Sequence, residues 1–159
     1  PNFLTAQYLH ATIQVNQEVP KLKLRNSLLR ALRASQESGV LWLNGDVVFD
    51  YKVLERVADR ITADKSFVCV NTSATADEEV KYTVDAQGYI KELSKSVKGA
   101  LGEAVGINFI SSHEKADVII QLDACGEQDY FERGLELAIE KHGLQMEPID
   151  ISDLSGKSN

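Results

Sequence analysis

Two aspartates after a short apolar run are the residues of this chain best placed to do chemistry. In the segment VLWLNGDVVFD, the apolar run Val40–Leu43 stops at the turn Asn44-Gly45-Asp46, and Asp50 follows four positions later. A continuous apolar run bounded by a turn is typical of a strand buried on both faces of a parallel sheet. Ligands of open α/β sheets bind outside the carboxyl ends of such strands. Asp46 is therefore in position to meet a metal-bound phosphate.

The two aspartates have different interpretations. Magnesium typically takes one or two protein carboxylates and completes its shell with phosphate oxygens and water, and Asp46 on a glycine turn can supply such a ligand. The alternative is a turn aspartate that bonds its own backbone, and the sequence of the turn does not decide between them. Asp50 begins a predicted helix and is interpreted as its N-cap.

Three more charged residues are candidates for substrate contacts. Lys81 and Lys95 fall on or just after the strands of a predicted hairpin, and a lysine ammonium is a compact charge for phosphate. Glu103 can accept hydrogen bonds from a substrate hydroxyl or ammonium group. The alternative is that all three are ordinary exposed residues of the sheet. The sequence has no Walker loop and no GxGxxG motif.

The bulk composition excludes some classes of function. The 159 residues fit one domain, and 43% hydrophobic with 26% charged residues is usual for a soluble globular protein. A formal charge of −7 argues against a nucleic-acid partner, which would require a basic patch. A small anionic ligand then requires a metal ion or local lysines to offset repulsion.

The cysteines and the hydropathy pattern favour a cytoplasmic protein with no membrane partner. Cys69 lies inside an apolar run and is interpreted as a small buried residue, and its spacing from Cys125 fits no metal or redox motif. This usage suits a reducing compartment, although a single disulfide stays open. No apolar run approaches the roughly 20 residues of a membrane helix, and no signal peptide is visible.

The first half of the chain predicts alternating helices and strands. The weak alternation of Leu9–Val15 suggests a strand. After it, Lys21–Ser38 and Tyr51–Ala63 show helical spacing, while Val40–Asn44 and Ser66–Asn71 read as buried strands. This alternating order of helices and strands is typical of a parallel sheet with helical crossovers.

The second half predicts a hairpin, a strand, two helices and a last strand. The hairpin comprises Val80–Val84 and Tyr89–Leu93 around a four-residue turn. The other elements are expected at Glu103–Ser111, at 113–124, at Asp129–His142 and at Met146–Ile151. The predicted fold is α/β, with a mostly parallel central sheet, flanking helices and an additional hairpin in one domain over residues 1–159.

Three ordered segments carry a family resemblance. They are LNGDVVFD (43–50), DEEVKYTVDAQGYIKELSKSV (77–97) and GEAVGINFIS (102–111). RNSLLRAL before them, and DYFERGLELAIEKHG and MEPIDISDL after them, keep the same order. Together they resemble nucleotidyltransferases of the sugar-phosphate and phosphocholine type, above all the phosphocholine cytidylyltransferase-like group. The resemblance covers nearly the whole chain and implies a Rossmann-like (GT-A-like) fold.

The resemblance implies roles for individual residues. Asp46 corresponds to the aspartate that holds Mg²⁺, Lys95 to a catalytic lysine that faces substrate phosphate, and Glu103 to a carboxylate near the acceptor. Lys81 is a further substrate-binding candidate.

A second metal ligand is expected in a late E-I-D motif. Pro148–Leu154 resembles that motif and makes Asp150 the candidate. The same segment also resembles a stretch just upstream of the motif, in which case the ligand lies beyond Asn159.

The implied reaction transfers a nucleoside monophosphate from an NTP, with CTP favoured, to a phosphorylated small acceptor such as phosphocholine or a sugar phosphate. The family's Gly-rich loop of the form LAAGxGxRL and its Pro-Lys-Pro segment do not occur in this sequence. We therefore expect little turnover from this chain alone. Three explanations stay open for the missing loop and Pro-Lys-Pro segment: they lie on another chain, they have been removed from this one, or a homo-oligomer replaces them.

Two other functions stay open. A metal-dependent glycosyltransferase would use a similar strand-end aspartate to hold a nucleotide-sugar diphosphate. A non-catalytic regulatory or assembly homologue would keep the fold without the loop, and its function would not depend on Asp46.

Overall fold

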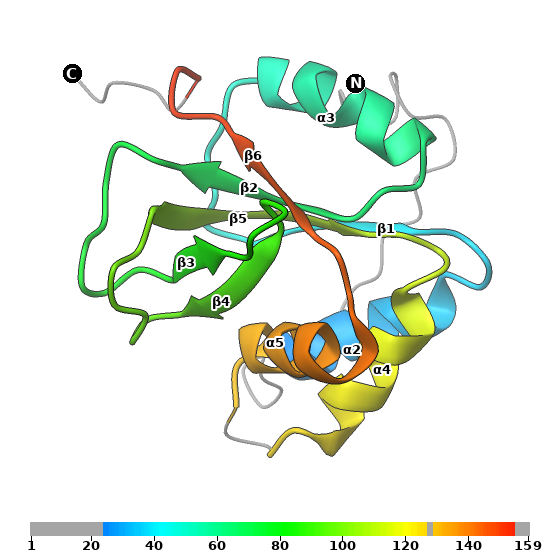
Figure 1. Cartoon of the computed structure of the whole chain (residues 1–159). Coiled ribbons are helices and arrows are strands. Elements are labelled where there is room, and N and C mark those ends of the chain that lie inside the picture. The colour runs from blue at the N-terminus through cyan, green and yellow to red at the C-terminus, as the bar shows by residue number, and fades with distance from the viewer. Residues whose placement is uncertain (1–23, 127–128, 155–159) are drawn as a thin grey trace.

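A computed structural model describes residues 24–126 and 129–154, which form one six-stranded sheet with helices on both faces (Figure 1). The helices in these ranges are α2 (Leu24–Ala34), α3 (Lys52–Thr62), α4 (Lys115–Ala124) and α5 (Phe131–His142). The strands are β1 (Val40–Leu43), β2 (Phe67–Asn71), β3 (Lys81–Val84), β4 (Ile90–Ser94), β5 (Gly102–Ile110) and β6 (Glu147–Asp150). The strand predicted at Leu9–Val15 lies outside the described residues.

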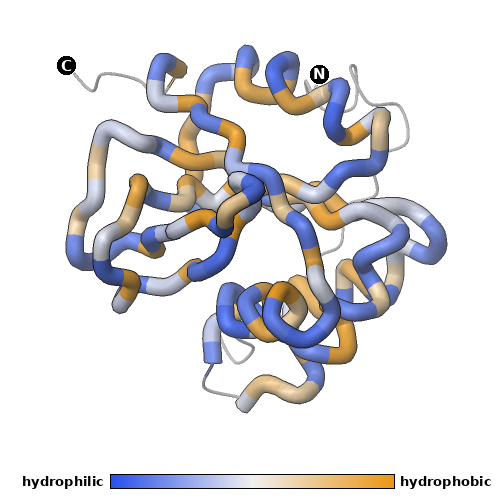
Figure 2. Tube along the Cα trace, in the orientation of Figure 1, coloured by the Kyte–Doolittle hydropathy of each residue, from blue (hydrophilic) through white to orange (hydrophobic). Residues whose placement is uncertain are grey.

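The sheet lies between two helical layers. In Figure 1, α3 covers one face, and α2, α4 and α5 cover the other. Strand β2 shows the consequence: Phe67 and Cys69 pack toward α3, while Val68 and Val70 pack toward the other three helices. Figure 2 shows the matching hydrophobic stretches in the strands and in the helices beside them. The apolar run of β2 is continuous because both of its faces are buried.

The sheet is mixed, and β5 is its central strand. One edge of β5 pairs with β2, and the other pairs with β3 near Gly102 and with β1 over 107–110, all antiparallel. The order is β4-β3-β5-β2-β6, and β2–β6 is the one parallel pairing within the described ranges.

The predicted α/β class, flanking helices and extra hairpin are confirmed, but the sheet is not mostly parallel. Strands β1 and β2 run in the same direction, as helical crossovers predict, yet β5 lies between them and runs the opposite way. The central position of β5 is explained by its apolar side chains, which point to both faces of the sheet. Ile107 and Phe109 pack toward α3, whereas Ile110 packs toward the other layer, so a central position buries both sides.

The expectation that β1 is fully buried is wrong. All four of its residues are half-buried, although Trp42 packs against one apolar cluster and Leu41 and Leu43 against the other. Among the described strands β1 pairs with β5 alone.

Local hydrogen bonds explain two predicted features. The Asp50 carboxylate accepts a hydrogen bond from the Lys52 backbone N–H at 2.9 Å, so it bonds the first residue of α3, although Tyr51 and not Asp50 occupies the N-cap position. In the hairpin turn, the Asp85 carboxylate accepts hydrogen bonds from the backbone N–H groups of Gln87 and Tyr89. The aspartate thus fixes the four-residue turn that the sequence indicates.

Helix α5 is docked on the outer edge of the hairpin. The Glu136 carboxylate accepts a hydrogen bond from the Leu93 backbone N–H at 3.0 Å. The Ile90 N–H donates to the Met146 carbonyl at 2.9 Å, which ties the same strand to the start of β6. Strand β4 is therefore covered at its edge, and α5 is held in a fixed position relative to β5.

Both cysteines are free and buried, as expected for Cys69. Burial raises the pKa of the Cys69 thiol to about 12, so this thiol is unreactive near neutral pH. Within the described ranges, none of the helices has the length and apolar content that a membrane span needs.

Gly106 is a point of close contact between β5 and the turn after β1. Its φ is 82°, and its carbonyl accepts a hydrogen bond from the Asn44 N–H at 2.9 Å. A Cβ atom at this position would lie 2.8 Å from both Asn44 Nδ2 and Val47 Cγ2. Only glycine has both the conformation and the space to let this turn lie on the strand.

We predict that Gly106→Ala lowers the free energy of unfolding by about 3 kcal/mol, because the methyl group adds a steric clash to left-handed strain. Gly88→Ala is the matched control, since Gly88 also has a positive φ (90°), but no described atom lies within 4 Å of the place its methyl group would take. Its loss is expected to be about 1 kcal/mol. Urea denaturation measures both, and equal losses would contradict the close contact at Gly106.

Candidate functional site

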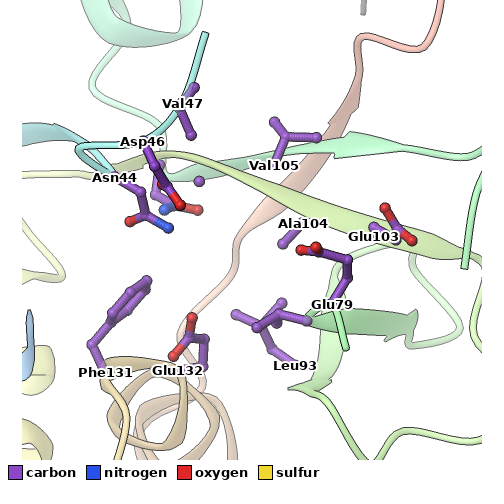
Figure 3. Close-up of a pocket in the computed structure, with 13 residues that line it drawn as sticks. Asn44, Asp46, Val47, Glu79, Leu93, Glu103, Ala104, Val105, Phe131 and Glu132 are labelled. Carbon is purple, nitrogen blue, oxygen red and sulfur yellow. The ribbon is translucent and has the colours of Figure 1, made fainter. Parts of the chain in front are cut away.

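A cavity of about 300 Å³ lies between the turn after β1, the middle of β5 and the start of α5 (Figure 3). It opens beside the carboxyl end of β1, where the sequence places the chemistry. The residues that line it are Asn44, Asp46, Val47, Glu79, Val80, Leu93, Glu103, Ala104, Val105, Gly106, Asn108, Phe131 and Glu132.

Asp46 lines this cavity, and its carboxylate has no hydrogen-bond partner among the described residues. The turn itself is held by the backbone, with the Val47 N–H donating to the Asn44 carbonyl at 3.1 Å. No described residue donates a hydrogen bond to the Asp46 side chain, so the turn-bonding alternative gains no support. Figure 3 shows the carboxylate pointing toward the space above Phe131 and Glu132. Its oxygens are available to an exogenous cation or donor.

Glu103 lies in the same cavity, on β5. One of its carboxylate oxygens accepts a hydrogen bond from the Ala76 backbone N–H. This bond ties the loop before β3 to β5 and holds the glutamate side chain in one orientation. The structure thus brings together two of the five predicted site residues, Asp46 and Glu103.

Lys81 does not line the cavity. Its side chain is buried, and its ammonium donates to the carbonyls of Ala76, Asp77 and Glu79 at 3.2–3.3 Å. The predicted substrate lysine therefore holds a loop, and that loop carries Glu79 to the cavity.

Lys95 is exposed and lies outside the lining, one residue after β4. Its Nζ is 5.8 Å from the centroid of the Tyr130 ring. It is close enough to Glu132 to favour the ionised form of that carboxyl group, so it lies on the α5 side of the cavity. The structure leaves it available to a ligand that extends beyond the cavity.

Asp150 ends β6 and is bonded within its own loop. Its carboxylate accepts hydrogen bonds from the Thr72 hydroxyl at 3.0 Å and from the Ser152 N–H at 2.9 Å. These bonds lower the pKa of Asp150, with the Ser152 hydroxyl contributing most. Asp150 is not among the cavity residues, and the described part of the chain contains no group of three or more Asp, Glu, His or Cys that could hold a metal.

Sequence reasoning missed two cavity residues, Glu79 and Glu132. Glu79 belongs to an acidic cluster interpreted as a solvated turn; it is exposed, but it also lines the cavity. Glu132 follows Phe131 at the start of α5. Its spacing from Glu136 could have indicated it, because two acids four residues apart lie on one side of a helix.

Burial raises the pKa of the Glu132 carboxyl group, and the nearby negative charge of Glu136 adds to the rise. Its own backbone N–H and the positive charge of Lys95 act in the opposite direction but do not cancel the effect. A carboxylate that is held in a partly desolvated cavity is typical of binding and catalytic sites.

Comparison with solved structures identifies the fold. An inositol-1-phosphate CTP transferase from T. maritima aligns with a TM-score of 0.62 and 13% identity, over 81% of this chain and 52% of that one. A putative glucose-1-phosphate thymidylyltransferase from Bacillus anthracis aligns with a TM-score of 0.66 and 12% identity, over 94% and 61%. HddC from Yersinia pseudotuberculosis aligns with a TM-score of 0.57 and 12% identity, over 82% and 54%.

The chain has a nucleotidyltransferase fold. It spans a little more than half the length of each of these three structures. No family model matches the sequence, and no curated protein matches it either. The resemblance that the sequence motifs suggest is thus supported by the fold.

We predict that Glu132→Gln stabilises the protein near neutral pH. Because the pKa of Glu132 is raised in the folded state, the wild type binds this proton more tightly when folded. Its stability therefore falls as the pH rises from the unfolded pKa, near 4.5, through the folded pKa. Thermal unfolding of both proteins at pH 7 and near pH 4 measures the effect. A Tm difference that is the same at both pH values would contradict the raised pKa.

Proposed function

We propose that this chain carries metal-binding and acceptor-binding residues of a nucleotidyltransferase site. The reaction transfers a nucleoside monophosphate, with CTP as the favoured donor, to a phosphorylated small acceptor such as phosphocholine or a sugar phosphate. A phosphate oxygen of the acceptor attacks the α-phosphorus, and the bond to the leaving pyrophosphate breaks. The proposed setting is the cytoplasm, with the nucleotide and the acceptor as the partners.

One observation carries this proposal: Asp46, which has no hydrogen-bond partner in the described part of the chain, shares a strand-end cavity with the anchored Glu103. The names of two neighbours support the substrate class, since they give inositol 1-phosphate and glucose 1-phosphate as substrates. The motif order from Asp46 to Asp150 supports it independently.

The donor set at Asp46 fits Mg²⁺, because this ion needs one or two protein carboxylates when phosphate oxygens complete its shell. When bound, the ion would offset negative charge on the phosphates. Asp46 would hold it, with Asp150 as the proposed second ligand. Hydrogen bonds to Thr72 and Ser152 occupy Asp150 in the structure, so it would have to exchange them to take that role.

The remaining roles belong to side chains around the cavity. Lys95 would neutralise the acceptor phosphate, and Glu103 would orient the acceptor through its second oxygen. Lys81 would act indirectly, because its three carbonyl contacts shape the loop that borders the cavity.

We predict that calorimetry detects Mg²⁺-dependent binding of CTP, and that Asp46→Asn weakens it about tenfold through the loss of one charged ligand. Other nucleotides, titrated with and without Mg²⁺, test the preference for CTP. Asp50→Asn is the control, since asparagine also caps helices and Asp50 bonds the start of α3.

Equal affinities of wild type and Asp46→Asn would contradict the proposed metal site and favour a non-catalytic homologue. Transfer from a nucleotide sugar without pyrophosphate chemistry would favour a glycosyltransferase instead.

A further inference from the structure

A second hollow, the apolar groove, lies on the α3 side of the sheet. Its volume is about 240 Å³, and it opens where the segment before α3 passes the turn after β6 (Figure 1). The described residues that line it all have apolar side chains: Val47, Val48, Phe49, Val105, Ile107, Ile151 and Leu154. All of them except Val48 belong to the apolar cluster under α3, so the groove is a place where that cluster reaches the surface.

Val48 protrudes beside this groove. Its side chain is 98% exposed, more than that of any other large hydrophobic residue in the described part of the chain. Tyr51, three residues later, is also exposed. Because a protruding apolar side chain and an apolar hollow are both in contact with water here, burying them against a partner is favourable.

The chemistry of the groove disfavours a small ligand and a membrane surface as its occupant. Sites for small molecules orient their ligands with a few polar groups, and the side chains of this lining supply none. An anionic membrane surface attracts basic segments, whereas this chain has a formal charge of −7. A protein surface with an apolar projection of its own fits the groove better.

A second copy of this chain has such a surface. A two-fold dimer uses the same patch on both subunits, so the patch must be complementary to itself. Val48 and the groove meet this condition, because the projection and the hollow lie side by side. The neighbouring charges meet it as well: Asp50 and Lys52 are both exposed and of opposite sign, so each acid can face the partner's Lys52.

We propose that Val48 and the apolar groove form a two-fold dimer interface, in which Val48 of each copy enters the groove of the other. Val47 and Val105 line both this groove and the cavity that contains Asp46, so the interface lies directly behind the turn that carries Asp46. The inference goes beyond the proposed function and does not depend on it.

Analytical ultracentrifugation of the whole chain tests the proposal. We expect a dimer at a chain concentration of about 100 µM, and we expect Val48→Asp to raise its dissociation constant about a hundredfold, because the two-fold axis removes two buried valines at once. Circular dichroism checks that the variant is folded, as the exposure of Val48 leads us to expect.

Ile120→Asp is the matched control. Ile120 is another exposed apolar residue, with 53% of its surface accessible, but it lies on α4, which covers the opposite face of the sheet from α3 (Figure 1). Its substitution should leave the dissociation constant unchanged.

A pair of introduced cysteines tests the arrangement of the two copies. Val48→Cys and Leu154→Cys are prepared separately, mixed and oxidised. The proposed interface brings the two new thiols together, so the mixture should give a disulfide-linked dimer that contains one copy of each variant. A mixture of Val48→Cys with Ile120→Cys should not, and the native Cys69 and Cys125 are buried.

A chain that is monomeric at this concentration would overturn the proposal, and so would a dimer that Val48→Asp leaves intact. Equal yields of linked dimer from the two cysteine mixtures would also overturn it. The binding of CTP and Mg²⁺ at Asp46 is measured separately by calorimetry, so failure of this inference and failure of the proposed function are distinguishable.

Discussion

The arrangement of this molecule depends on the contact between the turn after β1 and strand β5 at Gly106. Beyond this glycine, β5 pairs with β1, and before it the same edge pairs with β3. The left-handed conformation at Gly106 allows the change of partner and lets the Asn44-Gly45-Asp46 turn lie directly on the strand. The backbone bond from Asn44 to Gly106 then holds Asp46 at the mouth of the cavity.

The distribution of charge follows from this arrangement. Several cations are used to hold the fold: Lys81 bonds a loop, Lys115 bonds the segment after α2, and Arg56 bonds the Asp153 carboxylate at 2.6 and 2.8 Å. The carboxylates of the cavity receive no comparable partners from the described residues of its lining. The cavity beside Asp46 is thus negative because the cations lie elsewhere in the fold. A bound ligand would have to supply the positive charge that offsets its carboxylates.

Much of this fold could be predicted from the sequence. Apolar periodicity predicts α3, β2 and the hairpin. Asp50 and Asp85 add local signals, because each accepts a hydrogen bond from a backbone N–H two residues later. The insertion of β5 between β1 and β2 could not be predicted, because local pattern does not specify strand order.

The site was predicted only in part. Asp46 and Glu103 belong to recognisable motifs, and they do meet in one cavity. Lys81 was predicted to contact phosphate, but its ammonium bonds three backbone carbonyls. The sequence does not reveal which carbonyls a lysine will bond. The spacing of Glu132 from Glu136 indicates a shared side of α5 but not which part of the fold that side faces; the place of Glu132 at the cavity depends on how α5 docks through Glu136. The measurement that tests the central claim most directly is NMR relaxation with Mn²⁺ substituted for Mg²⁺ in the presence of CTP. The account predicts line broadening centred on the amides of Asp46 and Gly106, whereas broadening centred on Asp150 and Asp153 alone would contradict it.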